Sequence, residues 1–247
     1  MNKKYDEKLT SIPHFSVHNE MLPFVGEDYD KYRVLHVGES HYICLNKENE
    51  QKYNMDYFKE NWFSNKCEEI LQLDEGAYNT RKVIEDYIRY GMSGGRRYFR
   101  IFQNVANAFV DSGLVEENNY ENKRDIYENM VFMNFFQMPS LYEGKSFYDS
   151  LSRNASFSKI SPKEMWEYSV TKSIKVFDEV IDILEPRLIV FTSILAGNAY
   201  KKNHGKFYDS SRTLYLDHPT SPYWNRCKRG KLSSRKQLEM KLKAYCE

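Results

Sequence analysis

The stretch Arg33-Val34-Leu35-His36-Val37-Gly38-Glu39-Ser40-His41-Tyr42 decides the fold of this chain. In its first half, Val34, Leu35 and Val37 supply apolar, β-favouring side chains, which predict a buried strand over residues 33–37. Gly38 ends the strand and permits a tight turn or the close approach of a ligand. Four polar residues able to do chemistry follow: Glu39, Ser40, His41 and Tyr42. A strand that ends in glycine and reactive side chains is typical of a site in an open α/β sheet, although a surface loop after a core strand has the same form.

Three more apolar stretches predict strands, over residues 130–135, 187–191 and 213–217. Amphipathic helical patterns separate them, and the clearest helix begins at Ser161 and ends near Leu184. Strands alternating with long helical crossovers favour parallel pairing, with helices on both faces of the sheet. We therefore expect an α/β fold, a three-layer α/β/α arrangement around a central four-stranded, mostly parallel sheet.

Length and composition are consistent with one large domain. The chain has 247 residues, of which 41% are hydrophobic and 15% aromatic, enough for a packed core. Residues 1–30 predict an irregular or short helical lead-in, because Pro13, Pro23 and Gly26 interrupt any long helix. The α/β domain is expected over residues 31–247.

Several classes of protein and site are disfavoured. No apolar run approaches the ~20 residues that span a bilayer, and no signal-peptide pattern opens the chain, so we expect a cytoplasmic protein without membrane contact. The spacing of the four cysteines suits neither zinc nor an iron–sulfur cluster. His14 and His18 are one helical turn apart with no acid beside them, which indicates a surface pair. We expect no metal and no cofactor.

Positive charge is concentrated near the C-terminus. The net charge is only +1, yet residues 226–243 contain eight lysines and arginines and one acid, Glu239. Such a segment suggests contact with a polyanion, and the alternative is a solvated basic helix.

Two further polar groups stand at predicted strand ends. Asn134 lies inside the apolar stretch 130–135, where a buried amide must be hydrogen-bonded or point into a site. Asp217 and His218 follow the last strand. Structural roles are possible for each: Asn134 can bond backbone, His218 can cap its loop, and Asp217 can orient His218 or face solvent. Ser40 can likewise be a helix N-cap.

Four segments together resemble the uracil-DNA glycosylase superfamily. Val34-Leu35-His36-Val37-Gly38-Glu39-Ser40 is similar to its first motif, and His218-Pro219-Thr220-Ser221-Pro222 to its closing His-Pro-Ser-Pro loop. Asn134 is placed like the asparagine that reads the base edge, and residues 185–190 resemble the lead-in to the third strand. The resemblance covers roughly residues 31–245 and rests on the order and spacing of short motifs.

This resemblance implies a uracil-DNA glycosylase-like fold and a DNA glycosylase, used either in DNA repair by base excision or in defence against modified foreign DNA. Such enzymes flip a nucleotide out of the duplex and hydrolyse its N-glycosidic bond. His218 would donate to a base oxygen as the departing base gains negative charge. Gly38, Tyr42, Asn134 and an aromatic ring would form the base pocket, and among Tyr53, Phe58 and Phe63 we take Phe58 as the stacking ring.

The same resemblance implies DNA contacts after the closing loop. The chain would act as a monomer on DNA with a flipped base, with a wedge at Pro222, Tyr223 or Trp224, although Tyr42 and Trp224 can also be core residues. The predicted DNA-binding residues are Ser221, Tyr223, Trp224, Arg226, Lys228 and Arg229.

The first motif departs from the family pattern. The best-known branch has Gly-Gln-Asp-Pro-Tyr-His, and here Ser40 stands where that water-positioning carboxylate would be and His41 replaces the proline. Other branches begin Gly-Glu-Ala-Pro-Gly, so Glu39 has precedent. We take Glu39, Ser40 and His41 with His218 as the catalytic set, acting on a damaged or modified pyrimidine. The alternatives are a non-catalytic nucleic-acid-binding module of the same fold and, less favoured, a serine/histidine hydrolase.

Overall fold

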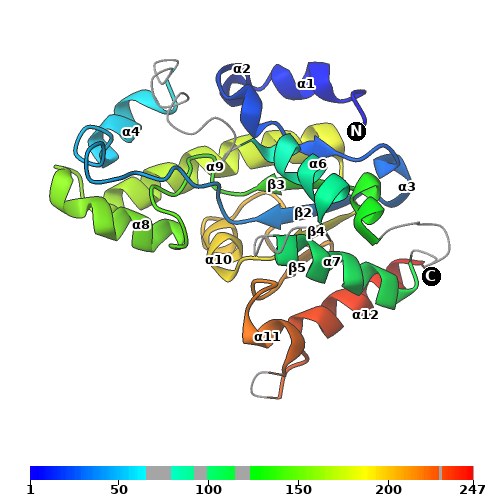
Figure 1. Cartoon of the computed structure of the whole chain (residues 1–247). Helices are drawn as coiled ribbons and strands as arrows, with labels where there is room; N and C mark the ends of the chain where they lie inside the picture. The colour runs from blue at the N-terminus through cyan, green and yellow to red at the C-terminus, as the bar shows by residue number, and fades with distance from the viewer. Residues whose placement is uncertain (65–78, 92–98, 115–122, 228–229, 247) are drawn as a thin grey trace.

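The computed structural model describes residues 1–64, 79–91, 99–114, 123–227 and 230–246. Within them, one five-stranded sheet has the strand order β1-β3-β2-β4-β5 (Figure 1). The strands are β1 (Phe24–Val25), β2 (Val34–Gly38), β3 (Met130–Asn134), β4 (Leu188–Phe191) and β5 (Thr213–Tyr215). The chain is therefore an α/β protein with a mixed sheet.

The four predicted strands are present and parallel to one another, but the expected strand count was wrong. β1 pairs antiparallel with the outer side of β3, with Phe24 opposite Phe132. Two residues directly after Pro23 are too few to show an alternating pattern, so the sequence carried no sign of this edge strand. β5 also ends at Tyr215, two residues earlier than expected.

Eleven α-helices and three short 3-10 helices lie within the described residues. The α-helices are α1 (Asp6–Thr10), α2 (Pro13–Val17), α3 (Tyr29–Tyr32), α4 (Met55–Asn61), α6 (Thr80–Tyr90), α7 (Phe99–Ser112), α8 (Phe147–Asn154), α9 (Pro162–Leu184), α10 (Ile194–Lys202), α11 (Pro222–Asn225) and α12 (Ser234–Cys246). The 3-10 helices are η1 (Asn19–Met21), η3 (Lys123–Asn129) and η4 (Ala155–Phe157). Ser161 caps α9 as predicted, because its Oγ accepts a hydrogen bond from the Glu164 N–H at 3.2 Å.

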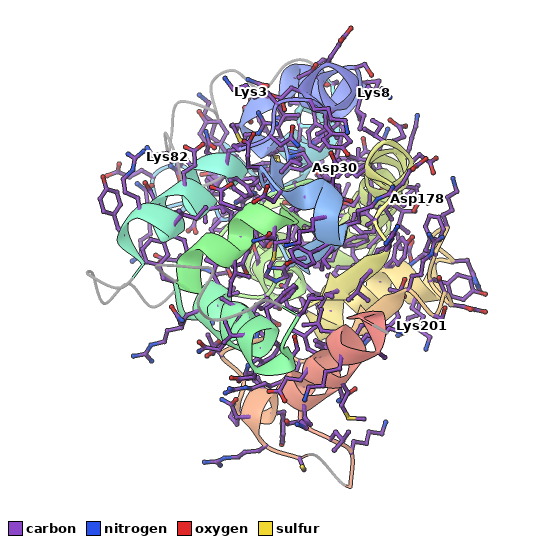
Figure 2. All side chains as sticks on the ribbon, turned by 90° about the vertical axis from the view of Figure 1, so that its right-hand side faces the viewer. Lys3, Lys8, Asp30, Lys82, Asp178 and Lys201 are labelled. Atoms are coloured by element: carbon purple, nitrogen blue, oxygen red, sulfur yellow. The ribbon has the colours of Figure 1, made fainter. Side chains whose placement is uncertain are left out.

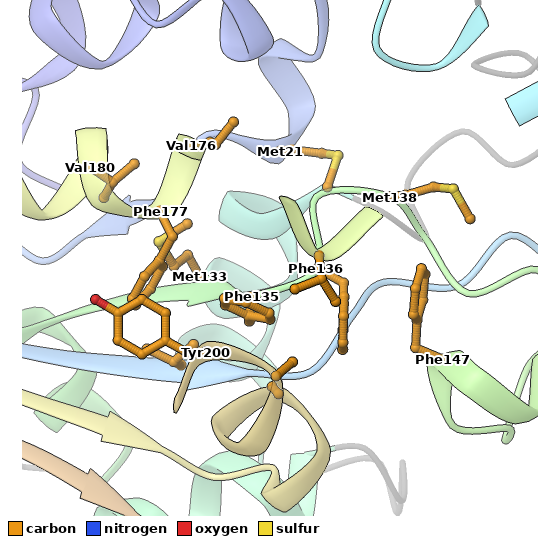
Figure 3. Packing of buried hydrophobic residues seen from close by; sticks show 14 of the residues in the cluster. Met21, Met133, Phe135, Phe136, Met138, Phe147, Val176, Phe177, Val180 and Tyr200 are labelled. Atoms are coloured by element: carbon orange, nitrogen blue, oxygen red, sulfur yellow. The ribbon is translucent and has the colours of Figure 1, made fainter. Parts of the chain in front are cut away.

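Helices cover both faces of the sheet. Because side chains alternate along a strand, Leu35 and Val37 of β2 pack in one hydrophobic cluster and Val34 in the other. The first cluster joins the sheet to α1, α2, α4, α8, α9 and α10, and Figure 3 shows its aromatic part. There the rings of Phe136 and Phe147 stack with centroids 4.2 Å apart. The second cluster joins the other face to α6, α7, α11 and α12.

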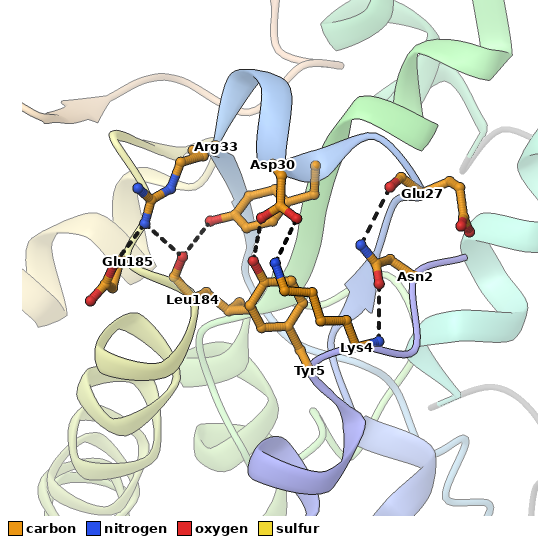
Figure 4. Close-up of polar contacts among 9 residues, drawn as sticks. Asn2, Lys4, Tyr5, Glu27, Asp30, Arg33, Leu184 and Glu185 are labelled. Carbon is orange, nitrogen blue, oxygen red and sulfur yellow. Dashed lines mark hydrogen bonds and ion pairs between the residues drawn. The ribbon is translucent and has the colours of Figure 1, made fainter.

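The N-terminal 30 residues pack as part of the same domain. Leu9 and Phe15 are fully buried in the first cluster. The Tyr29 hydroxyl donates to the Leu184 carbonyl at 3.1 Å, and Lys4 and Tyr5 both bond Asp30 (Figure 4). The packing therefore continues across the predicted boundary between residues 30 and 31.

The part of the basic segment from Ser234 onward forms α12, which packs on α7 through Leu238 and Leu242. Part of its charge is used inside the fold, because Arg235 pairs with Asp111 and Glu239, and Lys236 pairs with Glu239 at 3.0 Å. Across the described ranges, no helix combines the length and apolar character needed to cross a membrane.

Candidate functional site

Gly38 and Asn134 lie side by side where β2 and β3 end. The parallel register pairs them directly, and a Cβ on Gly38 would stand 2.3 Å from the Asn134 Oδ1. Asn134 is 7% exposed, and within the described residues its side-chain amide has no hydrogen-bond partner. The absence of a side chain at Gly38 thus makes room for a nearly buried amide whose hydrogen-bonding capacity is unused.

We expect Gly38→Ala to push the Asn134 amide out of place. A methyl group cannot share this space, and overpacking of this kind costs about 1–3 kcal/mol of unfolding free energy. Urea unfolding of Gly38→Ala, Asn134→Ala and the double variant measures the coupling between the two sites. If the added methyl group clashes with Asn134, the double variant loses less unfolding free energy than the two single variants together. Strictly additive losses would show that the clash is not with Asn134.

His218 lies in the loop after β5 with one ring nitrogen already engaged. The Thr220 N–H donates to His218 Nδ1 at 3.3 Å, and the Thr220 Oγ1 lies 2.8 Å from the same atom. Because Nδ1 accepts, the proton of the neutral ring is on Nε2. Burial lowers the pKa of His218, which favours that neutral form. The ring is therefore set to donate a hydrogen bond through Nε2.

The loop that carries His218 is anchored from two sides. The Ser221 N–H donates to the His218 carbonyl at 2.8 Å, which closes the turn. Across the molecule, the Asn104 side-chain amide of α7 donates to the Pro219 carbonyl at 2.7 Å. Asn104 was not among the predicted site residues, because nothing in its helical pattern marks a contact 115 positions away. It positions the His218 loop against α7.

His36 is a buried histidine on β2, two residues before Gly38. The Thr192 hydroxyl donates to the Val37 carbonyl at 3.2 Å, so it accepts from His36 Nε2, which is 2.8 Å away. His36 Nδ1 then accepts from the Tyr127 hydroxyl at 3.0 Å. Burial, with a smaller repulsion from His218, lowers the pKa of His36 to about 3. The ring is neutral and both of its nitrogens are satisfied.

Glu39, the residue directly after β2, has both carboxylate oxygens engaged by hydrogen bonds. Its Oε1 accepts from the Phe147 N–H at 2.9 Å and its Oε2 from the Ser193 hydroxyl at 2.7 Å. These partners stand at the first turns of α8 and α10, where a negative charge is favourable. The carboxylate therefore ties two helices to the end of β2. This structural role does not match the predicted catalytic role of Glu39.

Among the hydrogen bonds of the described residues, none joins Ser40, His41 or Tyr42 to His218. Ser40 is 8% exposed and its Oγ has no hydrogen-bond partner among the described residues. His41 is 5% exposed, and its Nε2 lies 2.8 Å from the hydroxyl of Thr80 on α6. Tyr42 forms a parallel bridge with Ser140, and burial followed by the charge of Glu39 raises its pKa. His41 is thus a packing residue rather than a group open to substrate.

Two predicted ligand-facing aromatic residues are core residues instead. Phe58 is 0% exposed and packs against Trp62, so it cannot stack on an entering base. Trp224 is also 0% exposed and lies in the second hydrophobic cluster, so it cannot be a wedge in DNA. Both errors have one cause, since an aromatic side chain at a helical position looks the same in sequence whether it faces core or ligand.

The residues around α11 have mixed outcomes. Ser221 caps α11 by accepting from the Tyr223 N–H at 3.2 Å. Tyr223 is 42% exposed and Arg226 is exposed, so both are accessible to a partner. Asp217 bonds Ser234 at the start of α12, with its N–H donating to Ser234 Oγ at 3.0 Å. Lys228 and Arg229 lie outside the described residues.

The histidine pair His14 and His18 is buried, contrary to the expected surface position. His18 stacks on Trp62, and its Nε2 lies 2.7 Å from the Trp62 carbonyl. His14 Nε2 is buried without a hydrogen-bond partner among the described residues. Across the same residues, no three His, Cys, Asp or Glu side chains come together as metal ligands.

Comparison of the chain with protein-family models, with curated proteins and with solved structures finds no match.

Proposed function

We propose that this protein is a DNA glycosylase-like hydrolase that cleaves the N-glycosidic bond of a flipped, damaged or modified pyrimidine. The proposal includes a uracil-DNA glycosylase-like fold, as the motifs suggest. The observation that carries it is the state of His218, a neutral ring whose Nδ1 is occupied by Thr220 and whose Nε2–H is left to donate. A neutral donor at a strand end is what a leaving base with developing negative charge requires.

In this mechanism the bond between the sugar and the base breaks before water attack is complete. The sugar becomes oxocarbenium-like and electron density moves onto the base. The His218 Nε2–H donates to a base oxygen and stabilises that charge. A fixed donor in a site that excludes water stabilises charge without reorganising during the reaction.

Asn134 would recognise the flipped base. Its amide carries two donors and one acceptor, which suits the alternating pattern on the Watson–Crick edge of a pyrimidine. The unused hydrogen bonds of this nearly buried group support the proposal, since a base edge would satisfy them. Tyr42 would limit the size of the base at C5, and the buried Ser40 hydroxyl would contact it on another side.

DNA contact would involve the surface around α11. The exposed Tyr223 is the remaining candidate for a wedge, because Trp224 is buried. An aromatic ring stacked on a base contributes about 1–3 kcal/mol. Arg226 would meet a flanking phosphate. The protein would act on DNA in the cytoplasm as a monomer, either in repair or in defence against modified foreign DNA.

One observation favours the non-catalytic alternative. The Glu39 carboxylate is engaged by Phe147 and Ser193, and Ser40 replaces the usual acid, so neither of the two residues after Gly38 offers a free carboxylate to position water. A module of the same fold that binds a base without cleaving it would need only Asn134, His218 and the basic surface. The serine/histidine hydrolase is disfavoured, because Ser40 Oγ contacts no histidine within the described residues.

A lesion panel tests the proposal. Wild-type protein is incubated with duplexes that each carry one defined pyrimidine lesion, followed by alkali to cut at abasic sites. We expect strand cleavage at one or a few lesions and none in the unmodified duplex. Tight, lesion-selective binding without cleavage would instead establish the binding module, and neither binding nor cleavage of any duplex would refute both proposals.

A further inference from the structure

Three arginines meet at the edge of the sheet opposite the strand-end site. Arg33, Arg187 and Arg212 each directly precede a strand: β2, β4 and β5. These strands are parallel neighbours, so the residues before them must lie together. The backbones are joined there, because the Arg187 N–H donates to the Arg33 carbonyl at 2.8 Å.

The three arginines line a cavity of about 340 Å³. Asp182, Glu185 and Phe207 also contribute to its wall. Figure 2 views the molecule from the right-hand side of Figure 1 and labels Asp30 of α3 and Asp178 of α9. The cavity is thus separate from the strand ends that carry Asn134 and His218.

Both carboxylates of the cavity are already compensated. Glu185 pairs with the Arg33 Nη2 at 2.9 Å, a contact that also reaches the Leu184 carbonyl (Figure 4). Asp182 pairs with Lys206. Among the described residues Arg187 and Arg212 have no acidic partner, so two guanidinium charges remain.

Local geometry prepares the arginines for a ligand. The Arg212 guanidinium lies 4.7 Å from the centre of the Phe207 ring, which restrains its orientation. Arg33 and Glu185, which form the ion pair in the wall, both have left-handed backbones with φ of 53° and 46°. Non-glycine residues in this region carry a cost that the surrounding structure must offset.

We propose that this cavity binds the phosphate group of a small phosphorylated molecule. A guanidinium group presents paired N–H donors that match two oxygens of a phosphate, and two such groups balance a dianion. The volume accommodates a phosphate or diphosphate with part of the molecule attached to it, whereas a duplex would have to reach the cavity from the face opposite the proposed glycosylase site. The proposal of a phosphate site in this cavity does not depend on the proposed glycosylase function.

Calorimetric titration with inorganic pyrophosphate at constant ionic strength tests this site. We expect saturable binding to the wild-type chain and at least tenfold weaker binding to the Arg187→Gln/Arg212→Gln variant. Arg89→Gln, an exposed arginine on α6, is the matched control and should bind as the wild type does. Arg187→Lys/Arg212→Lys keeps the charge without the paired donors and should be intermediate.

Three results would overturn the proposal: no pyrophosphate binding, equal binding by the wild-type chain and the double glutamine variant, or the same loss in Arg89→Gln. A short DNA duplex is titrated in parallel. If it loses affinity in the double variant while pyrophosphate does not bind, the edge contacts DNA and the small-molecule site is wrong. Thermal unfolding of each variant verifies that the fold is retained.

Discussion

The His218→Ala variant is expected to release base roughly 10²–10³-fold more slowly than the wild type in single-turnover assays, the usual loss for one charge-stabilising donor. The reason is the preset ring: Thr220 occupies Nδ1, and burial keeps the imidazole neutral, so Nε2 donates at no cost of reorganisation. In the proposed mechanism, alanine removes this donor and leaves the developing charge on the base without a partner. The measurement uses the lesion that the wild type cleaves best in the panel.

A control variant distinguishes a loss of catalysis in His218→Ala from a loss of folding. His204 is exposed and lies in the loop after α10, which carries none of the proposed site residues, so His204→Ala should leave the rate unchanged. His218→Ala should unfold in urea close to the wild-type midpoint, because its side chain makes contacts within its own loop. Base release at the wild-type rate by His218→Ala would remove this residue from the mechanism.

Stability is expected to fall as the pH decreases from about 7 towards 3, with His36 as a main contributor. Its pKa in the folded state is about 3, below the unfolded value of 6.5. Between these values the unfolded chain binds a proton that the folded chain excludes, so unfolding is favoured by up to about 1.4 kcal/mol per pH unit. Over the whole interval this amounts to about 4–5 kcal/mol.

The structure explains why the folded state excludes this proton. Protonated His36 would need acceptors on both nitrogens, yet Tyr127 donates to Nδ1, and burial raises the pKa of the Tyr127 hydroxyl so that it keeps its proton. His14 and His218, whose pKa values burial also lowers, add losses of the same sign. The contribution of these neutral histidines to the unfolding free energy is therefore complete above about pH 7.

Urea unfolding between pH 7.5 and 4.5 measures this effect. His36→Asn cannot take up a proton, so its stability should depend less steeply on pH than that of the wild type, whatever its stability at pH 7.5. His204→Asn, on the exposed loop, is the control and should retain the wild-type slope. If the unfolding free energies of His36→Asn and the wild type depend on pH with the same slope, the pKa of His36 is not lowered by its burial and this prediction is wrong.

Strand identity was predictable because it depends on local composition. Leu188 to Phe191 form a continuous apolar run, as a parallel strand buried on both faces must, and the structure has β4 there. Gly38 and Asn134, which were placed at strand ends, are paired where β2 and β3 end. Parallel strands bring their carboxyl ends together whatever the sequence of the crossovers.

Side-chain environments were predicted less well. Phe58 and Trp224 were assigned to ligands and are buried, and His14 and His18 were assigned to the surface and are buried too. In each case the residue type is compatible with both environments. The decision comes from contacts over long separations, such as that of His18 with the Trp62 carbonyl, 44 residues away.

Local sequence patterns were enough to predict the α/β class, the four parallel strands and the order in which polar groups reach the strand ends. These features follow from apolar runs, helix caps and glycine breaks, which act between near neighbours along the chain. Three features could be read from the three-dimensional arrangement alone: Glu39 ties α8 and α10 together, the Asn134 amide lies over Gly38 without a partner among the described residues, and three arginines line one cavity. Hydrogen bonds and charges of this kind depend on groups that the fold alone brings within reach of one another.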